Sequence, residues 1–386
     1  MKEKNIKLFY IHELLFQFND TMLAIVLPIF LYKLFDSISA FFVFTFIWNA
    51  VYLVFFIPVF NLAMKLKKPN YFMALGMIFY IIALWLFGQT TQENIKLIIP
   101  TTIFFTLYIT FYWMVRHWFL AINADYQKIG KQISTLMIIR LLIGFIAPIV
   151  GGALSFLVSF NVTFMLGALA GILSLIPIFL FQAPPHPNTY NFKKVIDILK
   201  KTHIKAIRFT YICEALNGIL VHNVWTLIFV IFIGNILKFG ILVGCTTLAA
   251  ISLSWLMGSW FDKRKRAIMI TRLSQIRVIS ILLYTTLFFY PHIFWVTIVE
   301  LINRLTLNMH ITVGDSYLFA YSNKIHPIHF ILNREVYLTI GRIISSAILA
   351  IIFYFLSANY LWIVLAIGAF ATLGFINLRK IDYLLH

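Results

Sequence analysis

Residues 10–28 read YIHELLFQFNDTMLAIVLP, and this stretch decides how the rest of the chain is interpreted. It has the length and apolar content of a membrane-crossing helix, yet it carries Glu13 and Asp20. On translocon-based scales a charged residue at the centre of such a helix costs about 2.5–3.5 kcal/mol, so it normally faces a bundle interior or a wet cavity. We therefore expect this helix to line an interior surface of a membrane protein.

A similar sequence occurs about half a chain length further on, at an offset of 201 positions. The matching residues are Tyr10 and Tyr211, Ile11 and Ile212, Glu13 and Glu214, and Leu15 and Leu216. A match at this offset in a chain of 386 residues indicates an internal duplication. We expect an N-terminal six-helix bundle over residues 1–182, a cytoplasmic central loop over 183–205 and a C-terminal six-helix bundle over 206–386.

The composition predicts an all-α polytopic membrane protein. Hydrophobic residues make up 62% of the chain and charged residues only 11%, which is too little polar surface for a globular protein in water. Apolar runs long enough to cross a bilayer recur from end to end. They span residues 8–34, 38–63, 71–88, 97–119, 133–158, 163–181, 206–234, 240–261, 273–290, 293–318, 332–356 and 360–377. The prediction is twelve transmembrane helices in two pseudo-symmetric six-helix bundles.

The distribution of basic residues predicts the orientation. If both termini are cytoplasmic, 25 of the 31 Lys and Arg residues fall at the inner side, and only Lys33, Lys96 and Lys238 at the outer side. Arg140, Arg304 and Arg342 fall within helices. We expect a multi-pass protein of the plasma membrane, acting as a monomer, with both termini in the cytoplasm.

This orientation can be tested by labelling. Single cysteines at Asn94 or Asn235 should react with an impermeant thiol reagent added outside intact cells, whereas one at Asn188 should not, because the basic residues place it inside. Labelling of the Asn188 position in intact cells would reverse the assigned orientation.

Other partners are not indicated. The net charge of +18 is explained by cytoplasmic loops, so no nucleic-acid binding is expected. Cys213 and Cys245 lie in apolar runs without metal-binding spacing, and His326 and His329 lack a third ligand, so we expect no metal and no cofactor. His117, beside Arg116, is expected at the membrane interface.

Two stretches have the composition of packing or gating motifs. Within residues 140–154, RLLIGFIAPIVGGAL, small residues would allow close helix approach and a proline would bend the helix; these residues are Gly144, Pro148, Gly151 and Gly152. Residues 258–268, GSWFDKRKRAI, combine Gly258, Asp262 and a basic run that includes Arg264. A glycine turn, a helix-capping Asp and bases at the lipid surface would latch two helices together.

Twelve helices in two sixes, a basic central loop and these two motifs resemble the major facilitator superfamily of secondary transporters. The resemblance implies alternating access, with helices 1, 4, 7 and 10 lining a central cavity. The fifth-helix motif is common in family members that export compounds against a proton gradient, which favours export. The loop after the second helix, NLAMKLKK at residues 61–68, lacks the Asp that the family usually has there. Asp262 is therefore the better match to the latch.

Polar residues inside the helices are the candidate site. On the first helix, Glu13, Gln17 and Asp20 fall within about 60° of one another at 100° per residue. The fourth offers Tyr108, Tyr112 and Arg116, the seventh Glu214, Asn217, Gly218 and Trp225, and the tenth Glu300, Arg304, Asn308 and Asp315. We expect Glu300 and Arg304 to pair at their i, i+4 spacing. The substrate-cavity candidates are Gln17, Tyr112, Asn217, Trp225, Glu300, Arg304, Asn308 and Asp315.

The favoured function is a secondary transporter for a small organic solute, with proton-coupled export. A carboxylate in a dry cavity binds protons more tightly, so it can load on one side of the membrane and release on the other. Asp20 is the first coupling candidate, followed by Glu13 and Glu214. The last two could instead pair with basic residues near the inner loops, since Lys7 and Arg208 lie six residues before them.

Three alternatives remain open. Arg140 and Arg342, at pseudo-equivalent positions, could bridge helices or bind the substrate of an organic-anion exchanger or importer. A polytopic membrane enzyme acting on lipid-linked substrates is a second possibility, although the largest loop shows no catalytic spacing of Asp197, His186 and His203. A membrane scaffold without transport activity is the third.

Overall fold

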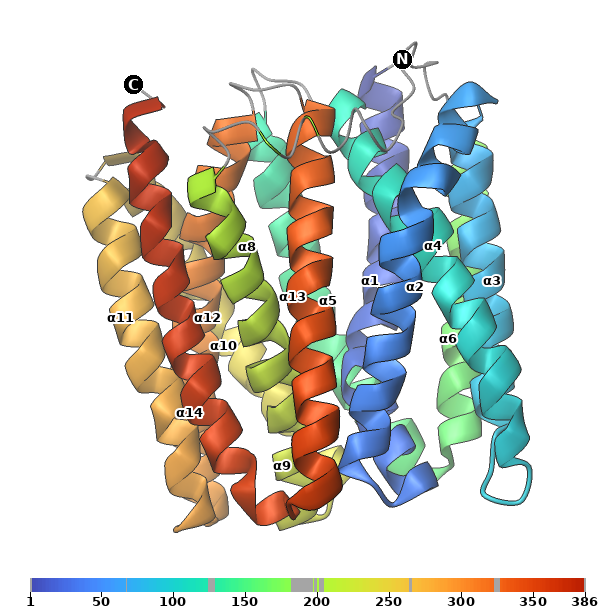
Figure 1. Cartoon of the computed structure of the whole chain (residues 1–386), viewed down its shortest axis with the longest axis vertical. Coiled ribbons are helices and arrows are strands. Elements are labelled where there is room, and N and C mark those ends of the chain that lie inside the picture. Colours follow the sequence, from blue (N-terminus) through green and yellow to red (C-terminus); the bar gives the residue numbers. More distant parts are fainter. Residues whose placement is uncertain are drawn as a thin grey trace.

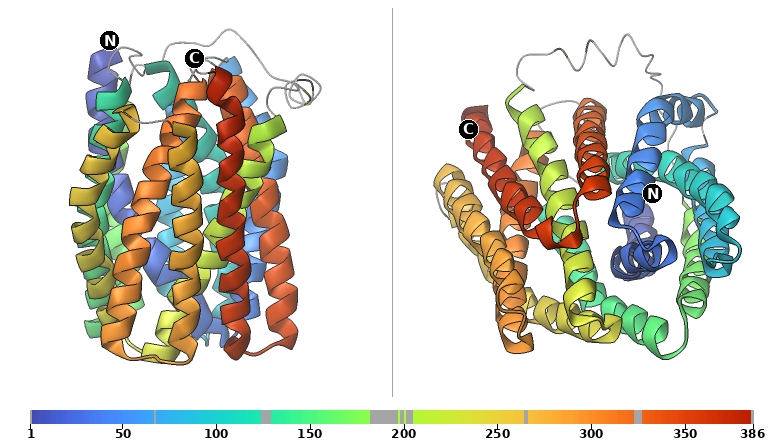
Figure 2. Two further views of the ribbon diagram at one scale, coloured as in Figure 1. Left: turned by 90° about the vertical axis from the view of Figure 1, so that its left-hand side faces the viewer. Right: turned by 60° about the horizontal axis from the view of Figure 1, so that its bottom comes forward.

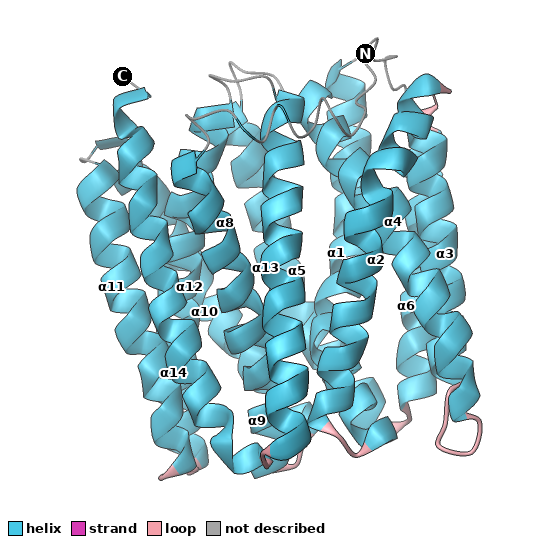
Figure 3. Ribbon diagram, in the orientation of Figure 1, coloured by secondary structure: helices cyan, strands magenta, loops and turns pink. Residues whose placement is uncertain are grey.

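The computed structural model describes residues 2–66, 68–123, 129–181, 197, 200, 205–263, 266–322 and 327–384. Within these ranges the chain is helical and has no strand (Figure 3). Ten described spans are long and apolar enough to cross a membrane, and Ile236–Ala250 is a further, shorter apolar stretch. The predicted class, an all-α polytopic membrane protein, is confirmed.

Twelve helical rods run side by side in the described part of the chain (Figure 1). The first six are α1 (Lys2–Phe35), α2 (Ile38–Lys65), α3 (Pro69–Gln89), α4 (Ile98–Asn123), α5 (Ile129–Leu157) and α6 (Phe160–Phe179). The seventh rod combines α8 (Lys205–Asn217), the π-helical η3 (Gly218–Asn223) and α9 (Val224–Ile233). The others are α10 (Ile236–Lys263), α11 (Arg266–Thr285), α12 (Ile293–Ser322), α13 (Pro327–Phe355) and α14 (Leu361–Ala371), which continues as η6 (Thr372–Leu384).

In chain order, we call the first six rods the N-half (α1–α6) and the last six the C-half (α8–η6) (Figures 1 and 2). Within the N-half, α1 packs on α5 and α6, and α3 packs on α4 and α6. Between the halves, the most extensive contacts join α2 to α13 and α5 to α10. Both chain ends lie at one end of the bundle, the terminal end, and we call the opposite end the far end.

Similar cross-links occur in the two halves. In the N-half, Asn19 of α1 donates its side-chain amide to the carbonyl of Gly167 of α6 at 2.8 Å. In the C-half, Asn217 of α8 donates to the carbonyl of Gly368 of α14 at 3.2 Å. Gly167 and Gly368 are separated by the same 201 positions as the repeated sequence. Each half therefore ties its first helix to its sixth in the same way.

The glycine-rich part of α5 packs directly on α10. A Cβ at Gly152 would lie 2.8 Å from the carbonyl oxygen of Ile236, and one at Gly144 would lie 3.0 Å from Cγ2 of Thr247. A Cβ at Gly240 would overlap the carbonyl oxygen of Pro148. The two backbones touch because side chains are absent at the crossing, as in other small-residue helix contacts. These residues act first as packing elements between the halves, and Gly151 packs on Met22 of α1.

We expect Gly240→Ala to destabilise the protein, because the new methyl group meets backbone that cannot rotate away. Overpacking of this kind costs about 1–3 kcal/mol. The matched control is Gly314→Ala, whose Cβ would meet only the ring of Phe375 at 3.4 Å. Thermal unfolding in detergent should show a lower midpoint for Gly240→Ala and an unchanged or higher one for Gly314→Ala. Equal midpoints in the two variants would contradict the close contact.

The predicted latch after the eighth helix needs correction. We expected Gly258 in a turn and Asp262 as a cap, but α10 continues through Lys263, so both residues are helical. Backbone hydrogen bonding carries the helix past the glycine because a single glycine lowers helix stability by only about 1 kcal/mol. Arg264 and nearly all of the central loop lie outside the described residues.

Candidate functional site

The strongest polar contact in the N-half joins Glu13 of α1 to Arg116 of α4. Nε of Arg116 donates to Oε1 of Glu13 at 2.7 Å, and Nη2 donates to Oε2 at 2.5 Å. The side chains are only 1% and 2% exposed, and the guanidinium group lies over the ring of Trp113 at 5.2 Å. Gln17 donates to Oε2 of Glu13 at 3.3 Å. Both oxygens of Glu13 are therefore occupied.

Asp20 is placed differently from Glu13. It is half-buried and, among the described residues, has neither a hydrogen bond nor an ion pair. Arg116 and Arg140 lie within electrostatic range of its carboxylate. A carboxylate without a fixed partner, near positive charge and away from bulk water, is able to exchange a proton or a ligand.

Tyr112 is not at an open surface, contrary to the prediction that it lines the cavity. Its side chain is fully buried, and its hydroxyl contacts Nε2 of His12 at 2.7 Å. Nδ1 of His12 in turn contacts the carbonyl of Ser174 at 3.1 Å. Tyr112 packs against Gly76 of α3, where the absent side chain leaves room for it. The chain of contacts fixes α1, α4 and α6 together.

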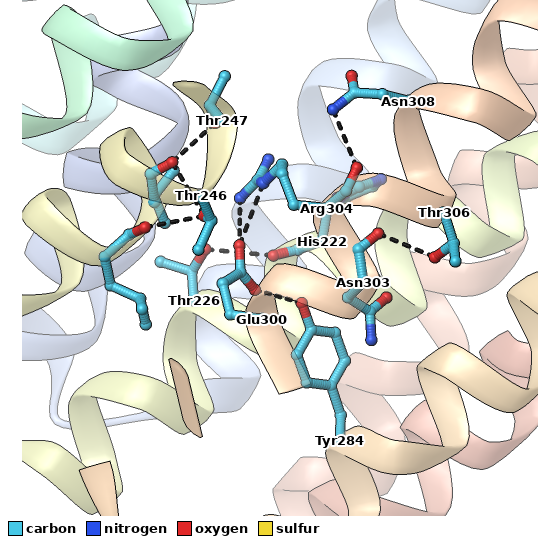
Figure 4. A network of polar contacts seen from close by, with 12 residues as sticks. His222, Thr226, Thr246, Thr247, Tyr284, Glu300, Asn303, Arg304, Thr306 and Asn308 are labelled. Atoms are coloured by element: carbon cyan, nitrogen blue, oxygen red, sulfur yellow. Dashed lines mark hydrogen bonds and ion pairs between the residues drawn. The ribbon is translucent and has the colours of Figure 1, made fainter. Parts of the chain in front are cut away.

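A second network occupies the C-half (Figure 4). The predicted pairing is confirmed, because Arg304 donates from Nε and Nη2 to Oε1 of Glu300 at 3.1 and 2.6 Å. The hydroxyl of Tyr284 donates to the other oxygen, Oε2. Glu300 is buried and both of its carboxylate oxygens accept hydrogen bonds, whereas the side chain of Arg304 is 21% exposed. Asn308 donates to the backbone carbonyl of Arg304 at 2.9 Å.

Arg277 was assigned to the inner loops from the sequence, and the structure corrects this. It is 1% exposed and lies between α11 and α12, where its Nη1 donates to the carbonyl of Asn303 at 2.8 Å and to the Asn303 side chain. No carboxylate among the described residues pairs with it. The guanidinium group of Arg277 is therefore bound by neutral oxygens. Its positive charge adds to that of nearby Arg304.

The seventh rod changes helix type at η3, and this alters which residues share a face. Trp225 was expected in the cavity, but it is 5% exposed and stacked on Tyr284 at 4.1 Å. Asn217 was also expected there and is buried against α14. The α-helical period no longer holds across a π-helical turn, which inserts extra residues. His222 is the exposed side chain of this segment, within electrostatic range of Arg277 and Arg304.

Glu214 does pair with a base, though not with Arg208. Its Oε1 accepts from Nη2 of Arg334 of α13 at 3.0 Å, and both side chains are 27% exposed. Glu13 likewise pairs with Arg116 and not with Lys7. Nearness in the sequence suggested the wrong basic partners for Glu13 and Glu214. The arginines that bind them lie 103 and 120 positions away in the chain.

The two arginines at pseudo-equivalent positions are half-buried. Arg140 lies within electrostatic range of Glu13 and Asp20, and Arg342 within range of Glu335 and Tyr52. Each of these two arginines therefore lies near a carboxylate of its own half. The side chain of Asp315 falls outside the described residues.

Glu335, which joins the halves, was not among the site residues expected from the sequence. Its Oε2 accepts from the hydroxyl of Tyr52 of α2 at 2.9 Å, and its Oε1 lies 3.1 Å from Nδ1 of His117 of α4. His117 therefore contacts the other half and is not simply an interfacial residue. Its position could have identified it, because Glu335 is an acid within the eleventh apolar run and Glu13 was selected as an acid within the first.

Sequence comparison finds neither a matching family model nor a matching curated protein. Solved structures do resemble the chain. A POT family transporter in complex with 5-aminolevulinic acid has a TM-score of 0.74 at 12% identity, covering 95% of this chain and 94% of that one. A peptide transporter POT in complex with sulfate gives 0.71 at 14% identity, over 99% and 95% of the two chains. The human organic anion transporter MFSD10 (TETRAN) gives 0.67 at 10% identity, over 100% and 99%.

At these identities the likeness concerns the fold. The chain shares the fold of these transporters over nearly its whole length and theirs. This confirms the predicted major-facilitator-type fold.

Proposed function

We propose that the protein is a secondary active transporter that moves a small organic solute by alternating access, with proton-coupled export. The observation that carries the proposal is Asp20, a half-buried acid with no partner among the described residues, on the first helix of a transporter fold. The other acids near it are paired, so Asp20 is the group free to respond to a proton or solute. The fold supplies two halves that can rock about a common interior.

The proposed solute site lies between Asp20 of α1 and the exposed polar groups of the C-half. These are the exposed His222 of η3 and the part-exposed Arg304 of α12, with the part-exposed Asn308 one turn beyond Arg304. Arg304 uses Nε and Nη2 for Glu300, and its Nη1 makes no bond to a described residue. Gln17 supports the Glu13–Arg116 pair by donating to Glu13, and Tyr284 supports the Glu300–Arg304 pair by donating to Glu300. Glu13 and Glu214 remain secondary coupling candidates because each is engaged by an arginine.

The coupling cycle follows from the electrostatics of Asp20. A proton neutralises the carboxylate when the site faces one side, and Arg116 and Arg140 favour its release when the site faces the other. Export is proposed as the direction on the strength of the α5 motif. We further propose that the protein acts as a monomer in the plasma membrane with both termini cytoplasmic.

Recognition of an organic anion is the second candidate. It is favoured by an excess of arginine over acid among the buried and part-buried described residues of the C-half, which are Arg208, Arg277, Arg304, Arg334 and Arg342 against Glu214, Glu300 and Glu335. Solved structures of the same fold include an organic anion transporter and a transporter bound to sulfate. If the pseudo-equivalent arginines bind such a group, Arg140→Lys and Arg342→Lys should weaken binding at least tenfold, about 1.4 kcal/mol, because lysine lacks the bidentate fork. Unchanged affinity in both variants would leave them as structural bridges.

The function can be tested in proteoliposomes. Vesicles preloaded with candidate solutes, among them amino acids, short peptides and organic anions, should show counterflow of a labelled solute with the protein present. Protein-free vesicles measure leakage. Failure of every class to exchange would contradict transport of a small organic solute.

A further inference from the structure

We infer that the C-half binds one negatively charged group of the solute, a carboxylate, between Arg304 of α12 and His222 of η3. The inference rests on the proposed function and deepens it, since it names the chemical class of the transported solute. The position differs from that of Arg140 and Arg342, which lie near carboxylates of their own halves.

Three basic side chains of the C-half lie at one depth in the bundle. Arg304 lies eleven residues after the start of α12, and His222 lies eleven residues before the end of α9. Arg277 lies eleven residues before Phe288, where the helical turn η4 that continues α11 ends. At about 1.5 Å per residue, each is roughly 16 Å from the far end of its rod. Arg277 and Arg304 are both within electrostatic range of His222.

At this depth the described residues of the C-half carry more positive than negative charge. The carboxylate found there is Glu300, and both of its oxygens are engaged, by Arg304 and by Tyr284 (Figure 4). Arg277 is 1% exposed and is bound by the neutral oxygens of Asn303, and its Nε has no hydrogen-bond partner among the described residues. A buried guanidinium group that no anion matches is costly in a low-dielectric interior.

The other acids of the C-half lie at different depths. Glu214 is eight residues before His222 on the same rod, about 12 Å toward the terminal end, and is already paired with an arginine. Glu335 lies eight residues after the start of α13, also toward the terminal end. Asp315, whose side chain is outside the described residues, is eleven residues beyond Arg304, about 16 Å along the helix. The excess positive charge is therefore open to an anion that enters from solution.

Arg304 and His222 supply the hydrogen-bond donors for such a group. Arg304 uses Nε and Nη2 for Glu300, its Nη1 makes no bond to a described residue, and its side chain is 21% exposed. His222 is exposed although it lies well inside a rod, and its ring donates at least one N–H in either protonation state. A carboxylate accepts hydrogen bonds at both oxygens, and those from a guanidinium group are charge-assisted. Because Glu300 fixes the guanidinium plane, the free edge of Arg304 is oriented before the solute binds.

The charges also determine which groups the site rejects. A primary amide has about the size of a carboxylate but no charge, so it leaves the excess positive charge unmatched. A cationic group would be repelled by Arg277 and Arg304. Asp20 does not supply the matching negative charge, because it lies fifteen residues before the end of α1, within electrostatic range of Arg116 and Arg140.

Pairs of acids and amides test the requirement for charge. The probes are benzoate, isovalerate and N-acetylalanine, each compared with its primary amide, and sodium chloride keeps the ionic strength constant. Thermal unfolding of the purified protein in detergent is followed against probe concentration, because a ligand of the folded form raises the midpoint. At least one acid should bind at least tenfold more tightly than its amide. If sodium chloride alone raised the midpoint as much, the bound anion would be inorganic and the inference would be overturned.

Two variants locate the site. Arg304→Lys keeps a positive charge beside Glu300 but loses the free guanidinium edge, so the affinity for the acid should fall at least tenfold. Glu300→Gln combined with Arg304→Gln removes the pair without leaving a buried charge, and it should weaken binding as much. Arg334→Lys is the matched control, since Arg334 also pairs with a glutamate, Glu214, and it should bind the acid as the parent does.

Equal affinities for every acid and its amide, or an unchanged affinity for the acid in Arg304→Lys, would overturn the inference. Transport is measured separately, by solute counterflow. Binding of an acid without counterflow of any solute would contradict the proposed function alone. Counterflow confined to neutral or cationic solutes would contradict the inference alone.

Discussion

Replacing Arg116 by Ala should lower the free energy of unfolding by about 3–5 kcal/mol, the range measured when one member of a buried ion pair is removed. The reason is that Glu13, 1% exposed, would be left as a buried carboxylate without its two charge-assisted hydrogen bonds. The substitution also empties the space that the guanidinium group fills beside Phe9, Phe16 and Trp113. Thermal and denaturant unfolding of the purified protein measure the loss.

Two comparisons isolate the buried charge. Glu214→Gln removes one member of the half-exposed pair with Arg334, and pairs of that kind contribute at most about 1 kcal/mol. The double variant Glu13→Gln with Arg116→Met removes both charges and should recover much of the stability lost in Arg116→Ala. If Arg116→Ala costs no more than Glu214→Gln, the buried pair is not the main polar link of the N-half.

The second large effect concerns Asp20. Asp20→Asn should abolish transport of solute against its gradient but preserve exchange of solute across the membrane. A neutral amide imitates the protonated carboxylate, so the halves can still rock, but no proton can be released. Rates of counterflow and of gradient-driven accumulation in the same vesicles measure the two activities separately.

Asp36→Asn is the matched control, since Asp36 is an exposed acid in the turn after α1. It should retain both activities, because an amide tolerates the left-handed backbone conformation at φ 48° as well as a carboxylate does. Loss of exchange in a correctly folded Asp20→Asn protein would remove Asp20 as the proton carrier and favour a direct role in binding solute.

The helices could be predicted from the sequence because their cause is local. A run of apolar residues as long as the bilayer is thick forms a helix whatever surrounds it, and all twelve predicted runs correspond to rods in the described chain. The Glu300–Arg304 pair was predictable for the same reason, since both residues lie one turn apart on one helix.

Contacts between helices could not be derived in this way. Arg116 finds Glu13 across 103 positions, and Glu335 of the C-half meets Tyr52 across 283. Helical periodicity gives the face of a residue but not which helix covers that face. The change to a π-helix at η3 has no strong sequence signal either, and it turned Trp225 from a predicted cavity residue into a buried one.

The central claim is coupling of solute movement to protons, and gradient-driven accumulation tests it most directly. Proteoliposomes with a solute that shows counterflow are given an imposed proton gradient, no gradient, or a gradient with a protonophore. We predict solute movement against its concentration gradient only in the first condition, in the direction opposite to proton flow. Equal solute movement in all three conditions would contradict the account.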